Sequence, residues 1–206
     1  MIFGYTPLDL VALIGSILIG MTVHEVTHAY VGFMLGDTTA AEQGRISLNP
    51  LDHIDPLMTV VLPIATLLLF QAPILAARPV PFNPQRVRFD EFGAALIAFA
   101  GPLSNLVLAL IGSVLIHLLG TNVVVTGVLY IFVSLNVALF VFNLVPIPPL
   151  DGSRVLYAFA PEAVQQIMQQ IERFGLMIIF ALVLLGGFGG ALTNINNAVL
   201  QLVLRV

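Results

Sequence analysis

The sequence has no cysteine and no lysine, and it has few charged residues of any kind. The absence of cysteine excludes a disulfide framework, a Cys₄ metal site and a thiol nucleophile. Asp, Glu, Lys and Arg together make up 9% of the 206 residues, against about 25% in an ordinary soluble domain. Hydrophobic residues make up 59%. Because too few polar side chains are present to face water on all sides, this composition excludes a soluble globular enzyme and a disordered chain.

The charge balance excludes a second class of protein. Seven arginines stand against eleven acidic residues, which gives a formal net charge of −4. A protein that binds nucleic acid needs a basic patch to neutralise phosphates, so no nucleic-acid partner is expected. Length and composition together predict one domain over residues 1–206 that lies in a lipid bilayer.

Apolar stretches in the chain are long enough to cross that bilayer, which takes about 20 residues for about 30 Å of hydrocarbon. We therefore predict an all-α polytopic membrane protein with about four spanning helices. These helices are placed at residues 8–36, 92–119, 123–145 and 174–192. The N-terminus lacks a basic region and a small-residue cleavage site, so the first segment is expected to be a retained helix rather than a signal peptide.

Residues 56–77 are also long enough to span, but prolines interrupt and follow them. Proline removes a helical hydrogen-bond donor and clashes with the preceding turn. Irregular backbone at membrane depth is tolerated where protein or water satisfies it. The sequence therefore predicts a re-entrant or partly β hairpin segment around residues 56–84.

A metal-site pattern lies in the first predicted helix, at His24-Glu25-Val26-Thr27-His28. Two histidines at i and i+4 lie on one helical face, so both imidazoles can reach one cation. Glu25, beside His24, can hold a water molecule bound to that cation as a general base. Apolar residues flank the motif on both sides, and ionisable residues at membrane depth are expensive to keep there and usually functional. A buried polar cluster that only holds helices together is the structural alternative.

A catalytic zinc site needs a third protein ligand, and three places in the sequence offer one. His117 lies near the end of a predicted helix, where packing or an interfacial position is the simpler interpretation. Asp52, His53 and Asp55 form a cluster in a polar stretch, which favours a solvated loop. Asp151 is the strongest candidate, because three prolines break the chain before it and Gly152 permits a tight turn after it.

These motifs resemble those of the site-2 proteases, which are intramembrane zinc metalloproteases of peptidase family M50. HExxH in one apolar helix is followed by Asn143-Leu144-Val145-Pro146-Ile147-Pro148-Pro149-Leu150-Asp151-Gly152, which is similar to the family's NxxPxPxLDG pattern. Between them, Ala100-Gly101-Pro102-Leu103-Ser104-Asn105 is similar to the family's AGPxxN stretch. Shorter segments near residues 44–56 and 79–84 resemble the small bacterial and archaeal branch.

The resemblance implies His24, His28 and Asp151 as ligands of one Zn²⁺ per chain and Glu25 as the catalytic base. Asn143 matches a position that can bind the substrate carbonyl or the oxyanion. The implied substrates are transmembrane helices of other proteins, cleaved in regulated intramembrane proteolysis. The resemblance implies one protease domain, with a catalytic core at about residues 8–160 and a C-terminal helix or helices at about 164–206.

Two functions from other classes are the alternatives to a protease. A zinc transporter would use intramembrane His and Asp side chains to carry the ion, but it would need neither Glu25 beside a ligand nor the prolines before Asp151. A non-catalytic membrane scaffold would usually have lost Glu25 or a ligand. Serine and aspartyl protease motifs are not formed around Ser104 or Asp37.

The predicted ligands also constrain the topology. His24 and His28 lie in the C-terminal half of their helix, and Asp151 follows the 123–145 helix, so both helix ends must face one side of the membrane. The chain between them then crosses an even number of times, which predicts that residues 56–77 enter and return. Six of the seven arginines would share that face. The positive-inside rule therefore predicts a cell-membrane protein whose active site opens to the cytoplasm, with the N-terminus outside.

Overall fold

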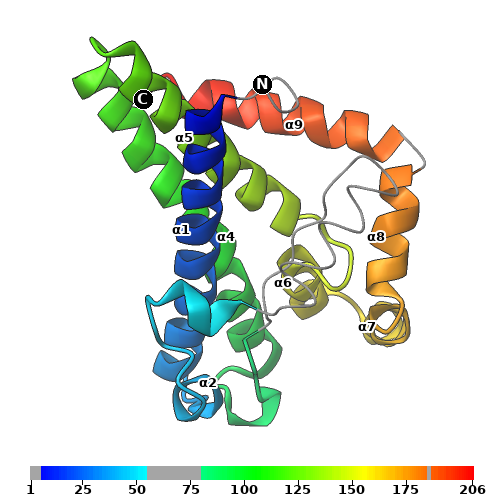
Figure 1. Cartoon of the computed structure of the whole chain (residues 1–206). Coiled ribbons are helices and arrows are strands. Elements are labelled where there is room, and N and C mark those ends of the chain that lie inside the picture. The colour runs from blue at the N-terminus through cyan, green and yellow to red at the C-terminus, as the bar shows by residue number, and fades with distance from the viewer. Residues whose placement is uncertain (1–5, 55–79, 185–186) are drawn as a thin grey trace.

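The computed structural model describes residues 6–54, 80–184 and 187–206, and these form helices joined by turns (Figure 1). The α-helices are α1 (Pro7–Met34), α2 (Thr39–Glu42), α4 (Asp90–Leu119), α5 (Val123–Asn143), α6 (Asp151–Phe159), α7 (Glu162–Glu172), α8 (Gly175–Leu184) and α9 (Gly187–Val203). The 3₁₀ turns η1 (Pro50–His53) and η3 (Pro84–Arg86) lie in the connections. The described residues contain no β-strand, so the prediction of an all-α protein is confirmed for this part of the chain.

Among the described residues, three helices are long and apolar enough to cross a membrane: α1, α4 and α5. Each agrees with a predicted segment to within two residues at either end. α1 begins with a capping box, in which the Thr6 side chain accepts a hydrogen bond from Asp9 N and the Asp9 carboxylate accepts one from Thr6 N. Asn122 caps the start of α5, because its side-chain oxygen accepts hydrogen bonds from Val124 N and Val125 N. The chain is therefore an integral membrane protein.

The predicted fourth spanning helix over residues 174–192 is wrong as a single helix. In the structure α8 ends at Leu184 and α9 begins at Gly187, and the two helices run in different directions (Figure 1). Ten residues of α8 extend about 15 Å, half of the hydrocarbon thickness. The physical reason lies in the glycines at positions 186, 187, 189 and 190, because glycine costs a helix about 1 kcal/mol per residue relative to alanine.

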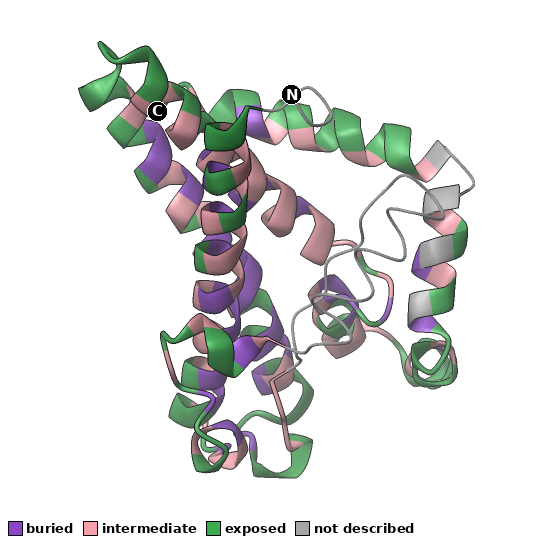
Figure 2. Cartoon of the chain, in the orientation of Figure 1, coloured by how far each residue is buried: buried purple, intermediate pink, exposed green. Residues whose placement is uncertain are grey.

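The long helices pack against one another along their small and β-branched residues. α4 contacts both α1 and α5, and buried residues run along the three ribbons (Figure 2). Large apolar side chains of the same helices are exposed. Ala109 from α4 and Val133, Val137 and Val141 from α5 form a hydrophobic core with two residues near the end of the chain. Exposed leucine and isoleucine on the outer faces are what a lipid environment requires.

The end of α1 and the start of α4 lie together. Arg88 N donates to Leu35 O at 2.8 Å, and Asn83 N donates to Asp37 Oδ2 at 2.7 Å. Burial raises the pKa of Asp37, but the hydrogen bonds from Asn83 N and Thr39 outweigh burial and lower the pKa. The carboxylate therefore stays ionised and holds the segment after α1 against the segment before α4. The predicted hairpin around 56–84 falls mostly outside the described residues, and residues 80–84, which are described, form no strand.

Candidate metal centre

α1 brings His24 and His28 together on one face, one helical turn apart. Both side chains are buried, and their Nε2 atoms lie 3.0 Å from each other. This is the arrangement that the i, i+4 spacing predicts. The pair lies at membrane depth, because His24 is about 15 Å before the C-terminal end of α1 at 1.5 Å per residue.

Asp151 approaches the two imidazoles from the first residue of α6. Its Oδ2 atom lies 3.1 Å from His24 Nε2 and 3.3 Å from His28 Nε2. The turn that aims it there depends on Gly152, where an added Cβ would lie 2.2 Å from Leu144 O at the end of α5. The three predicted metal ligands therefore meet, although Asp151 lies 127 positions after His24 in the sequence.

The donor atoms have the chemistry and spacing of a zinc site. Zn–N and Zn–O bonds of about 2.0–2.2 Å in a tetrahedron place ligand atoms roughly 3.3–3.6 Å apart, close to the distances observed here. Apart from the two imidazoles, Asp151 Oδ2 is buried without a hydrogen-bond partner among the described residues. Burial raises the pKa of Asp151, but hydrogen bonds from the adjacent imidazoles and their positive charge, when the rings are protonated, outweigh burial and lower the pKa to about 2. Two imidazoles and one ionised carboxylate thus form a group that can bind Zn²⁺.

α4 supplies the groups that orient the two imidazoles. His24 Nδ1 lies 2.7 Å from Asn105 Oδ1, and His28 Nδ1 lies 2.7 Å from Ile97 O. Since the Ile97 carbonyl can only accept, His28 Nδ1 carries the proton and Nε2 presents its lone pair toward Asp151. Gly101 lies directly against the rings, because an added Cβ would be 2.3 Å from His28 Nε2.

A cavity of about 480 Å³ opens beside the three donor atoms and contains the other predicted site residues. Glu25 lines it from α1, next to His24, and Asn143 lines it from the last turn of α5. Asn143 Nδ2 donates to Leu139 O at 3.0 Å, which leaves its second N–H free of that bond. The predicted ligands, the predicted base and Asn143 therefore share one cavity.

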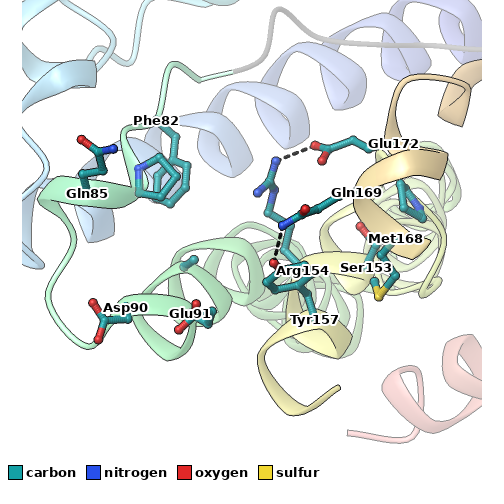
Figure 3. A pocket seen from close by; sticks show the side chains of 13 residues that line it. Phe82, Gln85, Asp90, Glu91, Ser153, Arg154, Tyr157, Met168, Gln169 and Glu172 are labelled. Carbon is teal, nitrogen blue, oxygen red and sulfur yellow. Dashed lines mark hydrogen bonds and ion pairs between the residues drawn. The ribbon is translucent and has the colours of Figure 1, made fainter. Parts of the chain in front are cut away.

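A second pocket of about 530 Å³ adjoins this cavity, between the start of α4 and helices α6 and α7 (Figure 3). The two share Phe82, Ala94, Arg154 and Glu172 among their lining residues. Arg154 and Glu172 form an ion pair at 2.6 Å, and the Arg154 guanidinium lies 5.9 Å from the centre of the Phe82 ring. This boundary is polar and half-exposed, in contrast to the buried donors.

The other candidate ligands lie elsewhere. His117 Nδ1 bonds to Ser113 O within α4. His53 Nε2 bonds to Ser47 O, and exposed Asp52 lies in η1. None of these three joins the group of His24, His28 and Asp151, and Asp55 lies outside the described residues. His117 is exposed near the end of α4 and Asp52 is exposed in η1, whereas His53 is buried, so a solvated loop is wrong for His53.

Comparison with known proteins places the chain among zinc proteases. The model of "Peptidase family M50" matches residues 120–186, a segment that contains Asn143 and Asp151. "Putative zinc metalloprotease YwhC" of Bacillus subtilis is 38% identical over 190 residues, which cover 87% of this chain and 84% of that protein. "Putative zinc metalloprotease Rip2" of Mycolicibacterium smegmatis is 26% identical, over 84% and 67% of the two chains. No solved structure matches the chain significantly.

The family model and the relatives agree with the donor set. The segment that matches the family model provides Asp151, and the structure brings this carboxylate to the two histidines of α1. A relative with 38% identity covers most of both chains. The chain therefore belongs to peptidase family M50, the site-2 protease family, and is a zinc metalloprotease.

Proposed function

We propose that this protein hydrolyses peptide bonds in or near transmembrane segments of other membrane proteins, as in regulated intramembrane proteolysis. The observation that carries the proposal is the position of Glu25, which lines the same cavity as His24, His28 and Asp151 at membrane depth. A site for metal storage or transport needs no carboxylate beside the ligands. A hydrolase needs one to move protons.

In this proposal His24 Nε2, His28 Nε2 and Asp151 Oδ2 hold one zinc ion per chain. Bound Zn²⁺ lowers the pKa of water to about 7 and polarises a carbonyl. Glu25 accepts the proton of the attacking water and passes it to the leaving amine. The second N–H of Asn143 donates to the carbonyl oxygen as negative charge develops on it.

The substrate class follows from where the cavity lies. Its lining includes the apolar side chains of Met21, Leu139 and Phe142 on spanning helices, so an apolar segment can enter from the bilayer. The carbonyls of a helical substrate are hydrogen-bonded within the helix. The substrate must therefore unwind locally before a peptide bond can reach Glu25 and Asn143.

We also propose that the site opens to the cytoplasm. The hydrogen bond from Arg88 N to Leu35 O supports this topology, because it puts residues 37 and 88 at one end of the spanning helices. Arg45, Arg86 and Arg88 lie in the connections at that end. Basic connections stay on the cytoplasmic side.

Thiol labelling tests this topology, since the native chain has no cysteine. Gln43→Cys and Gln85→Cys change exposed residues in these connections, and Thr121→Cys changes an exposed residue between α4 and α5. The first two variants should label from the cytoplasmic side and the third from the opposite side. Labelling of Gln43→Cys and Gln85→Cys from opposite sides would contradict the proposed topology.

The activity is tested with purified protein and a panel of membrane-anchored regulators in vesicles. We expect cleavage within or beside a transmembrane segment, its loss with a zinc chelator, and its recovery when zinc is added back. The same vesicles report zinc flux. Zinc transport without cleavage would show that the protein is a transporter and not a protease. Cleavage of soluble peptides alone would contradict the proposal that its substrates are transmembrane segments.

A further inference from the structure

A chain of buried amides connects the candidate metal ligand His24 to the backbone of α5. His24 Nδ1 lies 2.7 Å from Asn105 Oδ1, Asn105 Nδ2 lies 3.0 Å from Asn136 Oδ1, and Asn136 Nδ2 lies 2.9 Å from Phe132 O. Asn105 Nδ2 also lies 3.0 Å from Gly20 O. Both asparagines are fully buried, with 0% exposure.

Two backbone carbonyls determine the orientation of every group in this chain. The Phe132 carbonyl can only accept, so the NH₂ of Asn136 faces it and the oxygen of Asn136 faces Asn105. That oxygen and the Gly20 carbonyl are both acceptors, so the NH₂ of Asn105 must face them. The oxygen of Asn105 is then directed at His24, and this acceptor requires the imidazole proton on Nδ1.

The consequence reaches the candidate metal site. With its proton on Nδ1, neutral His24 presents the lone pair of Nε2 toward Asp151 and His28. If Asn105 turned over, its NH₂ would face His24 Nδ1 and favour the opposite tautomer, with a proton on Nε2 where a metal would bind. Asn136 and the Gly20 carbonyl together oppose that turn, because each has an oxygen that accepts from the Asn105 NH₂.

We propose that Asn136 is a positioning residue that fixes the tautomer of His24 through Asn105, although it is neither a metal donor nor one of the residues that line the cavity. The inference rests on the proposed role of His24 as a zinc ligand. It assigns a function to a polar residue that lies outside each of the sequence motifs and is buried in a spanning helix. Outer partners of ligating histidines typically change metal affinity 10–100-fold.

The direct test reads the imidazole tautomers by ¹⁵N NMR in the metal-free protein, at a pH where the rings are neutral. The chain has four histidines, so selective labelling gives few ring signals. In the native protein His24 should carry its proton on Nδ1. In Asn136→Leu, which removes the acceptor for Asn105, we expect a mixed tautomer at His24.

His28 is the internal control, since its Nδ1 proton is held by the Ile97 carbonyl and not by the amide chain. The tautomer of His28 should stay unchanged in every Asn136 variant that folds. Asn136→Asp is the matched variant, because its carboxyl group keeps an acceptor oxygen for Asn105 but loses the amide donor to Phe132 O. It should retain the native His24 tautomer.

Zinc affinity is the second measurement. We expect Asn136→Leu to bind zinc roughly 10–100-fold more weakly and Asn136→Asp to bind it as the native protein does. Should the Leu variant fail to fold, Asn136→Ala also removes the acceptor and adds no bulk. A native His24 tautomer in the folded Leu or Ala variant would overturn the proposal, as would equal shifts in the Asp and Leu variants.

Failure of the wider proposal gives a different result. If His24→Ala bound zinc as tightly as the native protein, His24 would not be a ligand and the proposed site would be wrong. The tautomer of His24 in the metal-free Asn136 variants would still show whether the amide chain orients the ring.

Discussion

Polar residues occur in two contrasting regions of this protein. Where α1, α4 and α5 meet, Asn105 and Asn136 are fully buried and His24 is 7% exposed. At the boundary between the two pockets, the Arg154 and Glu172 side chains of α6 and α7 are 48% and 46% exposed. The first region is a connected set of hydrogen bonds, and the second is an ion pair open to solvent.

The difference shows what each region can do. A polar group buried without a hydrogen-bond partner costs several kcal/mol. Each buried amide between the helices therefore keeps the orientation that its hydrogen-bond partner requires, and together the amides can hold a metal ligand in one orientation. An exposed ion pair is worth about 0.2–1 kcal/mol. Its side chains can therefore separate at little cost, beside the cavity in which a substrate must be received.

The largest effect should follow from loss of a donor in the buried region. We expect Asp151→Ala to lower zinc affinity by more than the 10–100-fold typical of outer partners, because it leaves two imidazoles and no carboxylate near the ion. Metal analysis and competition with a chelator measure the change. Unchanged affinity would remove Asp151 from the site.

The same site predicts how zinc binding depends on pH. The pKa of Asp151 is held at about 2, so this ligand stays ionised through the neutral and mildly acidic range. Histidine binds zinc as a neutral imidazole, so zinc affinity should fall as the pH drops and the two ligand imidazoles take up protons, while a site held by carboxylates alone would lose zinc only near pH ~2–4.

Asn143 should affect the rate rather than the metal. Loss of an oxyanion donor typically costs 10²–10³ in rate, or about 3–4 kcal/mol. Asn143→Leu should reduce turnover by that factor with zinc content unchanged, as measured on one cleaved membrane substrate. Full activity in this variant would show that Asn143 is a packing residue whose amide only donates to Leu139 O.

Gly101 tests how closely α4 must approach the imidazoles. A methyl group there would lie 2.3 Å from His28 Nε2, and it must displace the rings. We expect Gly101→Ala to weaken zinc binding by about the 10–100-fold seen when ligand orientation is lost. Gly127→Ala in α5 is the matched control, since nothing lies within 4 Å of the added atom, and equal zinc affinity in both variants would contradict the close contact.

The ligand set could be predicted from sequence, but the groups that orient it could not. The HExxH spacing places both imidazoles on one helical face by geometry alone, and the prolines before Asp151 mark the break that directs it inward. The sequence showed Asn105 as part of a motif, but it did not show which residue its side chain contacts. Asn136 gave no signal beyond a polar residue in an uncharged helix, because its role depends on a contact between α4 and α5 that local pattern does not encode.

The distribution of glycine explains which of the predicted spanning helices formed and which did not. Three apolar segments in which the glycines are spaced apart formed α1, α4 and α5, whereas the 174–192 segment contains four glycines within five residues and is divided between α8 and α9. Hydropathy over the window was high enough to span, but helix propensity was locally too low.

The smallest effect should come from the exposed region. A double-mutant cycle with Arg154→Gln and Glu172→Gln, followed by unfolding in detergent, should give a coupling of about 0.2–1 kcal/mol. Either substitution should leave zinc content unchanged. A coupling of several kcal/mol would show that this pair is as fixed as the buried amides and would remove the contrast between the two regions.

The central claim is that the buried site performs hydrolysis rather than metal storage or transport, and Glu25→Gln tests it most directly. Zinc content and cleavage of a membrane-anchored substrate are measured on the same purified preparation. We predict zinc content equal to that of the native protein and no detectable cleavage, because glutamine keeps the shape of the side chain but cannot accept the proton of water. Native cleavage by a zinc-loaded Glu25→Gln protein would contradict the account.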